Sequence, residues 1–133
     1  MMSPDSERNL DFYAAKIAQD IVSQNKGNYE PEDIENLVTK TLGVLQENGV
    51  YACVLYLNMK NTDLHKSVQK NLFDVTKKIG LEPPNTSDSD KSLNFVSDYI
   101  CKDLDTLFLT KQLWEQILLY ARYGAKAAKE RRS

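Results

Sequence analysis

The chain has 133 residues, of which 41% are hydrophobic and 27% are charged, and its net charge is −2 with a pI near 5.4. This length fits one hydrophobic core, so we expect a single domain over residues 1–133, and the composition excludes a disordered chain. The longest apolar run, residues 50–57, is far shorter than the roughly 20 residues of a membrane-spanning helix, which excludes an integral membrane protein.

Two features indicate the compartment in which the protein works. The N-terminal segment, residues 1–7, is polar and slightly acidic, so no secretory signal is expected. Cys53 and Cys101 both lie in apolar sequence surroundings and are predicted to be buried thiols rather than a disulfide. Such thiols are typical of a reducing compartment, so we expect a soluble, cytoplasmic protein.

Two amphipathic helices are predicted at the start of the chain, because apolar residues recur there every three or four positions. The first begins at Ser3-Pro4, a capping residue followed by a proline in the first turn, and ends at Lys26-Gly27. Gly27 is the expected C′ glycine of this helix. The second begins at Glu30-Pro31, with acids in its first turn where the helix dipole favours them, and ends at Asn48-Gly49.

The next segment, residues 50–60, is a short apolar stretch that fits either a buried strand or a buried helix. A helix is preferred, because no other segment alternates like a strand and a lone strand would leave its edges unpaired. Another helix, capped by Asn61, Thr62 or Asp63, is then predicted up to Gly80.

The last part of the chain contains a loop and two more predicted helices. Residues 81–90, rich in proline, serine and aspartate, form the predicted loop. A helix then starts at Ser89 or Asp90 and runs through Leu104, and Thr110 caps a final helix that continues into a basic tail. The sequence therefore predicts an all-α fold, a compact bundle of five to six helices.

The residues on which catalysis usually depends are sparse. His65 is the only histidine, so a metal site or a nucleophilic relay built on it would lack a second histidine. We interpret His65 as a solvent-exposed residue at a helix N-terminus. The two cysteines lack CxxC spacing, and the glycines form no phosphate-binding loop. Acidic pairs such as Asp88 with Asp90, or Asp98 with Asp103, are interpreted as caps or solvated faces. We therefore expect no enzymatic activity, no metal and no cofactor.

A basic stripe is the strongest candidate for a binding surface. Arg122, Lys126 and Lys129 are spaced i, i+4, i+7 and so share one side of the last helix, and Arg131 and Arg132 are expected to extend it. The chain from Arg122 onward carries a net charge of +4, which leaves −6 for the remainder. Two interpretations stay open: cations that the dipole of the helix C-terminus favours, or phosphate contacts to RNA.

Aromatic residues and a second group of lysines bear on the same question. Tyr120 and Tyr123 flank the stripe and either stack on bases or close the core, while Trp114 is interpreted as a core residue. The second cationic set is interpreted as a solvated helix face. It comprises Lys60, Lys66, Lys70, Lys77 and Lys78.

Three stretches share a pattern with one known family. Residues 7–17, ERNLDFYAAKI, place a basic residue before an aromatic-alanine pair, and residues 45–57, LQENGVYACVLYL, break a helix at Asn-Gly and resume it as an apolar helix. Residues 109–127 end in ARYGAKA, an arginine-aromatic-small-alanine signature, although Gly124 stands where the family usually has alanine. In this order the three stretches resemble the small subunit of type III-B (Cmr) CRISPR effector complexes.

The resemblance implies a non-catalytic, all-helical subunit that acts in antiviral defence. Copies of such subunits stack along an RNA-guided filament, between the backbone subunits and the large polymerase-like subunit, and brace the duplex of guide RNA and target RNA. Neither a membrane nor a small-molecule substrate is implied. Contacts to an A-form backbone need charge and shape rather than base-reading chemistry, so the basic stripe would supply them here.

Two alternatives from other classes remain. A helical adaptor that binds a single protein partner without nucleic acid fits the acidic pI and the predicted loop at residues 81–90. A small enzyme would require a pair of carboxylates buried in an apolar environment.

Overall fold

The described part of the chain, residues 4–60, 62–85 and 88–131 of a computed structural model, folds into six α-helices and contains no strand. The helices are α1 (Pro4–Asn25), α2 (Pro31–Asn48), α3 (Val50–Lys60), α4 (Asp63–Val75), α5 (Ser89–Phe95) and α6 (Leu104–Arg131). A 3₁₀ turn, η1 (Thr76–Ile79), continues α4, and a π-helical turn, η2 (Val96–Ile100), continues α5. The predicted all-α bundle is confirmed. None of these described helices combines the length and the apolar character needed to cross a bilayer.

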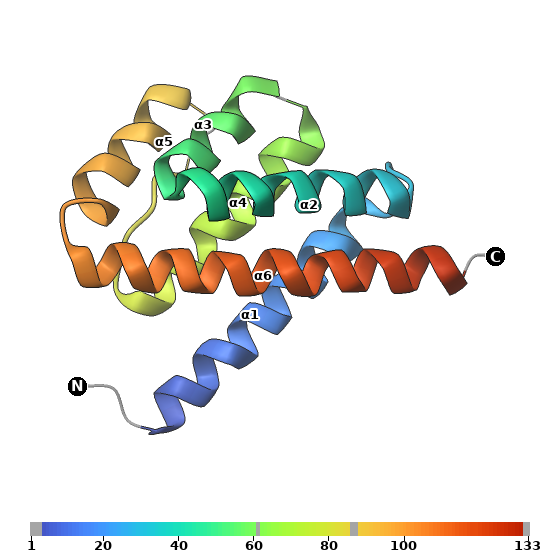
Figure 1. The fold of residues 1–133 in the computed structure, drawn as a ribbon, viewed down its shortest axis with the longest axis horizontal. Helices are drawn as coiled ribbons and strands as arrows, with labels where there is room; N and C mark the ends of the chain where they lie inside the picture. The colour runs from blue at the N-terminus through green and yellow to red at the C-terminus, as the bar shows by residue number, and fades with distance from the viewer. Residues whose placement is uncertain (1–3, 61, 86–87, 132–133) are drawn as a thin grey trace.

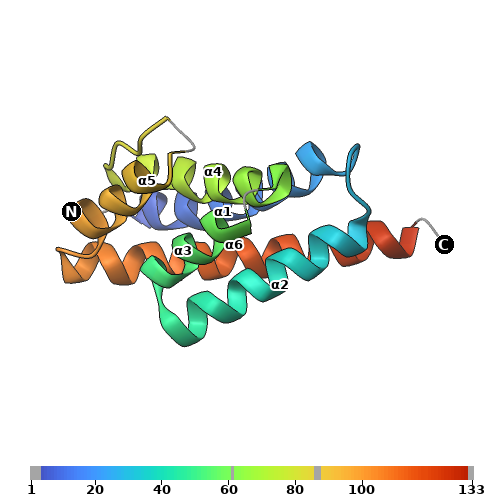
Figure 2. The same ribbon diagram turned by 90° about the horizontal axis from the view of Figure 1, so that it is seen from above.

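The longest helix, α6, is the axis on which α1 and α2 pack. It runs the length of the molecule, with α2 antiparallel along one side and α1 crossing it on another (Figures 1 and 2). The axis is apolar where its neighbours meet it, since Ile117, Leu118 and Ala121 are fully buried. On α1 the buried residues Ala14 and Ala18 are small, which lets the two helices approach closely.

The centre of the core is Trp114, which confirms its interpretation as a core residue. Its indole is fully buried and stacks on Phe73 with ring centroids 6.1 Å apart, and Phe73 also contacts the ring of Phe95. The indole Nε1–H donates a hydrogen bond of 2.8 Å to the carbonyl of Leu72. In a continuing α-helix, the carbonyl of Leu72 would accept a hydrogen bond from the amide of Thr76. Here the backbone tightens into η1, and the amide of Thr76 bonds to the carbonyl of Phe73. The carbonyl of Leu72 therefore needs another donor. A side chain of α6 thus completes the backbone bonding at the end of α4.

The junction between α2 and α3 consists of one residue, Gly49. Its amide bonds back to the carbonyl of Leu45, and its φ of 96° and ψ of −176° lie in a region that essentially only glycine occupies. The chain can therefore turn sharply after Asn48 and start α3 at once at Val50. The helix preferred for residues 50–60 is confirmed.

The boundary between the last two predicted helices was wrong. The helix expected to run through Leu104 ends at Ile100, and α6 begins at Leu104 rather than after Thr110. Asp103 starts α6, because its carboxylate accepts hydrogen bonds from both the amide and the hydroxyl of Thr106. Aspartate is the better N-cap residue, so it determines where the helix begins. Thr110 is buried inside α6, and its hydroxyl has no hydrogen-bond partner among the described residues.

Three smaller expectations had different outcomes. Thr62, one of three candidates, caps α4 and accepts a hydrogen bond from the amide three residues later. Gly80 ends the segment that contains α4 and η1, as expected, and it adopts the left-handed conformation. Gly27 has no positive φ, so the expected C′ glycine was wrong. The chain leaves α1 through a turn in which the amide of Tyr29 bonds to the carbonyl of Asn25.

Candidate nucleic-acid interface

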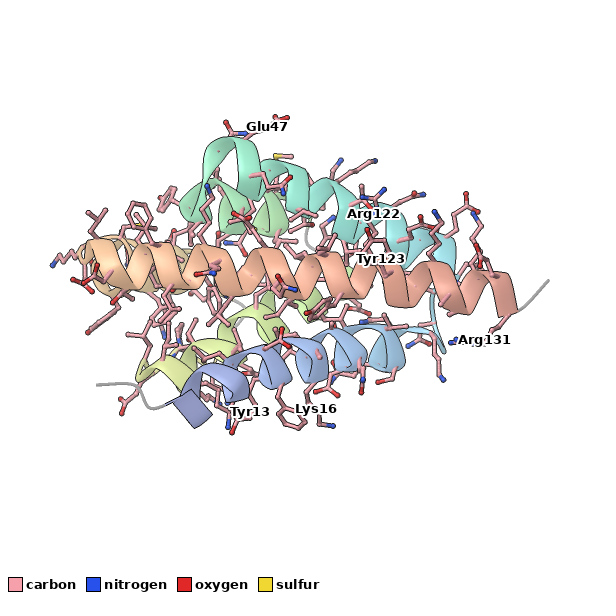
Figure 3. The ribbon with its side chains drawn as sticks, turned by 60° about the horizontal axis from the view of Figure 1, so that its bottom comes forward. Tyr13, Lys16, Glu47, Arg122, Tyr123 and Arg131 are labelled. Carbon is pink, nitrogen blue, oxygen red and sulfur yellow. The ribbon has the colours of Figure 1, made fainter. Side chains whose placement is uncertain are left out.

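The candidate interface is one side of the C-terminal half of α6. Lys126 and Lys129 are exposed there and Arg122 is half-buried, on the side of the helix that faces α2, as Figure 3 shows for Arg122. Their spacing of three and four residues places all three on one stripe, as predicted. Within residues 4–60, 62–85 and 88–131, neither Arg122 nor Lys126 forms an ion pair or a hydrogen bond. Both charges are therefore available to an external anion.

Arg131 does not extend this stripe. It lies nine positions after Arg122, about two and a half helical turns, and so on the opposite side of α6. Figure 3 shows it on the side toward α1, where it lines a groove of about 430 Å³ together with Lys26. The sequence interpretation grouped these cations by their proximity along the chain, which ignores the phase of the helix. Arg132 lies outside the described residues.

The two tyrosines that flank the stripe have different roles. Tyr120 is half-buried, and its hydroxyl donates a hydrogen bond of 2.9 Å to Asp11, which ties α6 to α1. Tyr123 is 59% exposed and points away from the bundle (Figure 3). Because Tyr123 precedes Lys126 by three positions, an accessible ring and a cation lie side by side on the helix. Of these two tyrosines, Tyr123 is the one whose ring is accessible to a base.

Negative charge limits the potential of this surface. The antiparallel packing of α2 on α6 places the first turn of α2 near the last turns of α6 (Figure 2). That first turn carries Glu32 and Asp33, which the dipole of α2 favours at this position. The cations of α6 therefore lie close to acids of a neighbouring helix, and the stripe is a local patch rather than a basic face.

Four of the five lysines of the second cationic set have two different environments in the structure. Lys66, Lys70 and Lys77 come together around a groove of about 640 Å³ between α3, α4 and the loop that follows η1. Lys78 lies elsewhere, with its ammonium 4.4 Å from the ring centroid of Tyr13, an arrangement that favours a cation–π contact. The three lysines that line the groove are exposed, which agrees with their interpretation as a solvated face.

The chemically reactive residues have distinct environments. His65 is half-buried beside the capping Thr62, and desolvation, with a smaller contribution from Lys60, lowers its pKa from the ordinary value. Cys53 is buried as predicted, and this burial raises its pKa to about 12. Cys101 is exposed, so the expectation of a second buried thiol was wrong. The π-helical turn before it places the preceding residue in the core and Cys101 outside.

Two of the acidic residues, Asp88 and Asp103, serve as helix caps. The carboxylate of Asp88 accepts from the amide of Lys91 at the start of α5, and hydrogen bonds from the hydroxyl and amide of Thr106 lower the pKa of Asp103. No aspartate or glutamate side chain that the structure describes is buried. No group of three His, Cys, Asp or Glu residues among those described could hold a metal ion.

The exposed large apolar side chains include two groups that the sequence did not single out. Tyr51, Leu55 and Met59 follow one another at four-residue spacing along α3 and are 43%, 49% and 70% exposed. Near the start of α6, Leu104 and Phe108 are similarly exposed. The spacing of the α3 residues was visible in the sequence, but only the packed structure shows which face of this apolar helix is turned outward.

Comparisons with known proteins give no assignment: no family model, no curated protein and no solved structure matches the chain.

Proposed function

We propose that this chain is a non-catalytic small subunit of a type III-B (Cmr) CRISPR effector complex, in which it braces the guide RNA–target RNA duplex. The observation that carries the proposal is the junction at Gly49. The most recognisable stretch of the resemblance is a helix broken at Asn-Gly, and here the break depends on a backbone conformation that favours glycine. The motif therefore has a structural reason in this chain.

The basic stripe of α6, which we define as Arg122, Lys126 and Lys129, supports an RNA-facing role. Two of its cations have no partner among the described residues, and the exposed ring of Tyr123 lies beside Lys126. Such a small patch is weak for a free RNA-binding protein. A subunit that its neighbours hold in place needs fewer contacts, because the assembly raises the effective concentration of the RNA.

The exposed apolar side chains support a role within an assembly. Leu55 and Met59 on α3 form part of a stripe of apolar surface that a protein neighbour would cover, which agrees with a subunit that packs between others. Its partners would be the backbone subunits, the large polymerase-like subunit and further copies of itself, together with guide RNA and target RNA. The proposed site of action is the cytoplasm.

The first test is purification of a tagged chain from its native host, followed by mass spectrometry and sequencing of any RNA that is recovered. Guide RNA together with backbone-type CRISPR subunits is the expected result. One stoichiometric protein partner without RNA would contradict the proposal and favour the adaptor instead.

A second test examines the basic stripe with a control on the same helix. In the purified complex, the double variant Arg122→Glu, Lys126→Glu should weaken RNA binding and reduce the salt-dependence slope of log K by about 0.9 for each lost duplex contact. Arg131→Glu reverses a charge on the opposite side of α6 and should have a smaller effect. Equal effects of both changes would show that the stripe is not the site of contact.

A further inference from the structure

A second surface of the molecule has the features of a ligand site. We refer to it as the lysine groove; it lies between α3, α4, η1 and the loop after η1, far along the chain from the basic stripe, and has a volume of about 640 Å³. This is within the range of roughly 300–1,000 Å³ that is typical of small-molecule sites. The residues that define it here are Asn58, Lys66, Lys70, Phe73, Lys77 and Pro84.

The cations of the lysine groove are placed by helix periodicity. Lys66, Lys70 and Lys77 recur at i, i+4 and i+11, so their side chains leave the same face of α4 and its continuation η1. Asp74 accepts ion pairs from Lys70 at 3.3 Å and from Lys77 at 3.8 Å, which hold the two ammonium groups on either side of one carboxylate. Lys66 has no ion pair among the described residues. Three positive charges and one negative charge therefore leave an excess of positive charge for an anion.

A buried donor without a partner provides independent support for a ligand. Asn58 lines the lysine groove, and its side-chain nitrogen Nδ2 is buried and has no hydrogen-bond partner among the described residues. A buried amide without a partner destabilises the fold, because it loses its hydrogen bonds to water and gains none in return. A ligand oxygen or ring nitrogen in the groove would restore the missing bond after a small shift of the side chain.

The other walls favour a planar ligand. Pro83 and Pro84 are half-buried, and their rings form a stiff apolar wall, because proline fixes the backbone angle φ. Leu57 and Phe73 add apolar surface from the core side. An acidic peptide would use the cations but would not need this combination of flat apolar walls and amide donors. A nucleotide uses all of them: its phosphate meets the lysines, its base the proline wall, and its polar edges the amide groups.

We infer that the lysine groove binds the phosphate and base of a nucleotide, either a free mononucleotide or one unit of a single strand. This site goes beyond the proposed function, because it lies on a different surface from the basic stripe and requires no other subunit. Success or failure of the complex purification therefore does not decide it.

The test uses the isolated full chain and four probes: AMP, inorganic phosphate, an eight-nucleotide poly(A) RNA, and polyglutamate. Binding is followed by NMR, through the side-chain amide signal of Asn58 and the backbone amides of α4. We expect AMP or the RNA to shift these signals more strongly than phosphate or polyglutamate. Binding of AMP would show that a free mononucleotide is enough to fill the groove. Binding of the RNA without binding of AMP would show that the ligand is a nucleic-acid strand.

Variants assign the binding to the lysine groove. Lys66→Gln with Lys70→Gln should weaken binding about tenfold at low salt and, for the RNA, reduce the salt slope by about 1.4, since a single-strand contact contributes about 0.7. The matched control, Lys40→Gln with Lys102→Gln, removes the same charge from exposed lysines elsewhere and should bind like the wild type. Asn58→Leu should raise the melting temperature, because it removes an unpaired buried amide, and yet weaken binding.

Three results would overturn the inference: no binding of AMP or RNA to the wild type, unchanged binding by the lysine variant, or equally tight binding of polyglutamate. The last result would mean that the lysines attract any polyanion and that the apolar walls do not contribute to binding of a base.

Discussion

Burial separates the two cysteines chemically. Only the thiolate reacts, so Cys53, which is fully buried and has its pKa raised to about 12, is predicted to be inert in the folded protein. Cys101 also has a raised pKa, but its thiol is exposed. We expect a thiol reagent at mildly alkaline pH to label one site per folded chain, at Cys101, and both sites in denaturant. Mass spectrometry of the labelled peptides checks this, and fast labelling of Cys53 in the native protein would contradict its placement in the core.

His65 predicts a pH dependence of stability. Its pKa in the folded protein lies below the ordinary value of 6.5, because partial burial and the charge of Lys60 disfavour the protonated ring. The unfolded chain therefore binds the proton first, and stability is lost as the pH falls below this value. In urea unfolding between neutral pH and about pH 5, the variant His65→Asn should lose less stability than the wild type. If the variant lost as much stability as the wild type, groups other than His65 would cause the pH dependence.

At the scale of elements, helix ends depend on a few residues with special chemistry. Gly49 lets α2 stop and α3 start without a loop, and a Cβ at this position would contact nothing within 4 Å. The cost of a side chain there is thus backbone strain rather than a clash.

Replacement of Gly49 measures this strain directly. Gly49→Ala should lower the free energy of unfolding by about 1–3 kcal/mol. Gly27→Ala is the matched control, since Gly27 has equal space but no positive φ, and it should be neutral or stabilising by up to about 1 kcal/mol. Urea unfolding of both variants provides the measurement. Equal changes in the free energy of unfolding would show that alanine is not strained by the backbone conformation at position 49.

At the scale of the whole molecule, Trp114 connects parts of the chain that are distant in sequence. It fills the centre of the core from α6, stacks on Phe73 of α4 and donates a hydrogen bond to the carbonyl of Leu72. Its replacement should therefore affect the cooperative unfolding of the bundle rather than one helix.

Trp114→Phe is expected to destabilise the fold by about 2–4 kcal/mol, because it leaves a small cavity and a buried carbonyl without its donor. Tyr120→Phe also removes one hydrogen bond between distant segments, but this bond is exposed to solvent, so its loss should cost less than about 1 kcal/mol. Chemical denaturation of the two variants compares these values. Similar losses would mean that the buried carbonyl finds another donor.

Local signals in the sequence were enough to determine the helical character of this chain and most of its helix ends. Periodic apolar residues, Pro31 after Glu30, and Gly49 act within a few positions, so α2 was predicted with the bounds that the structure shows. The spacing of Arg122, Lys126 and Lys129 also implied a shared side of α6, because helix geometry alone fixes it. The boundary near Leu104 was missed because two capping residues competed and the apolar pattern continued across the break.

The tertiary structure alone decided which surfaces are exposed and which distant residues meet. Arg131 shares a groove with Lys26, Cys101 is exposed while Cys53 is buried, and the three groove lysines lie in one groove with Pro83 and Pro84, which follow them in the chain. These outcomes depend on how whole helices rotate and pack against one another. Periodicity specifies one apolar face for each helix, but the partner that covers that face is selected by packing over the entire core.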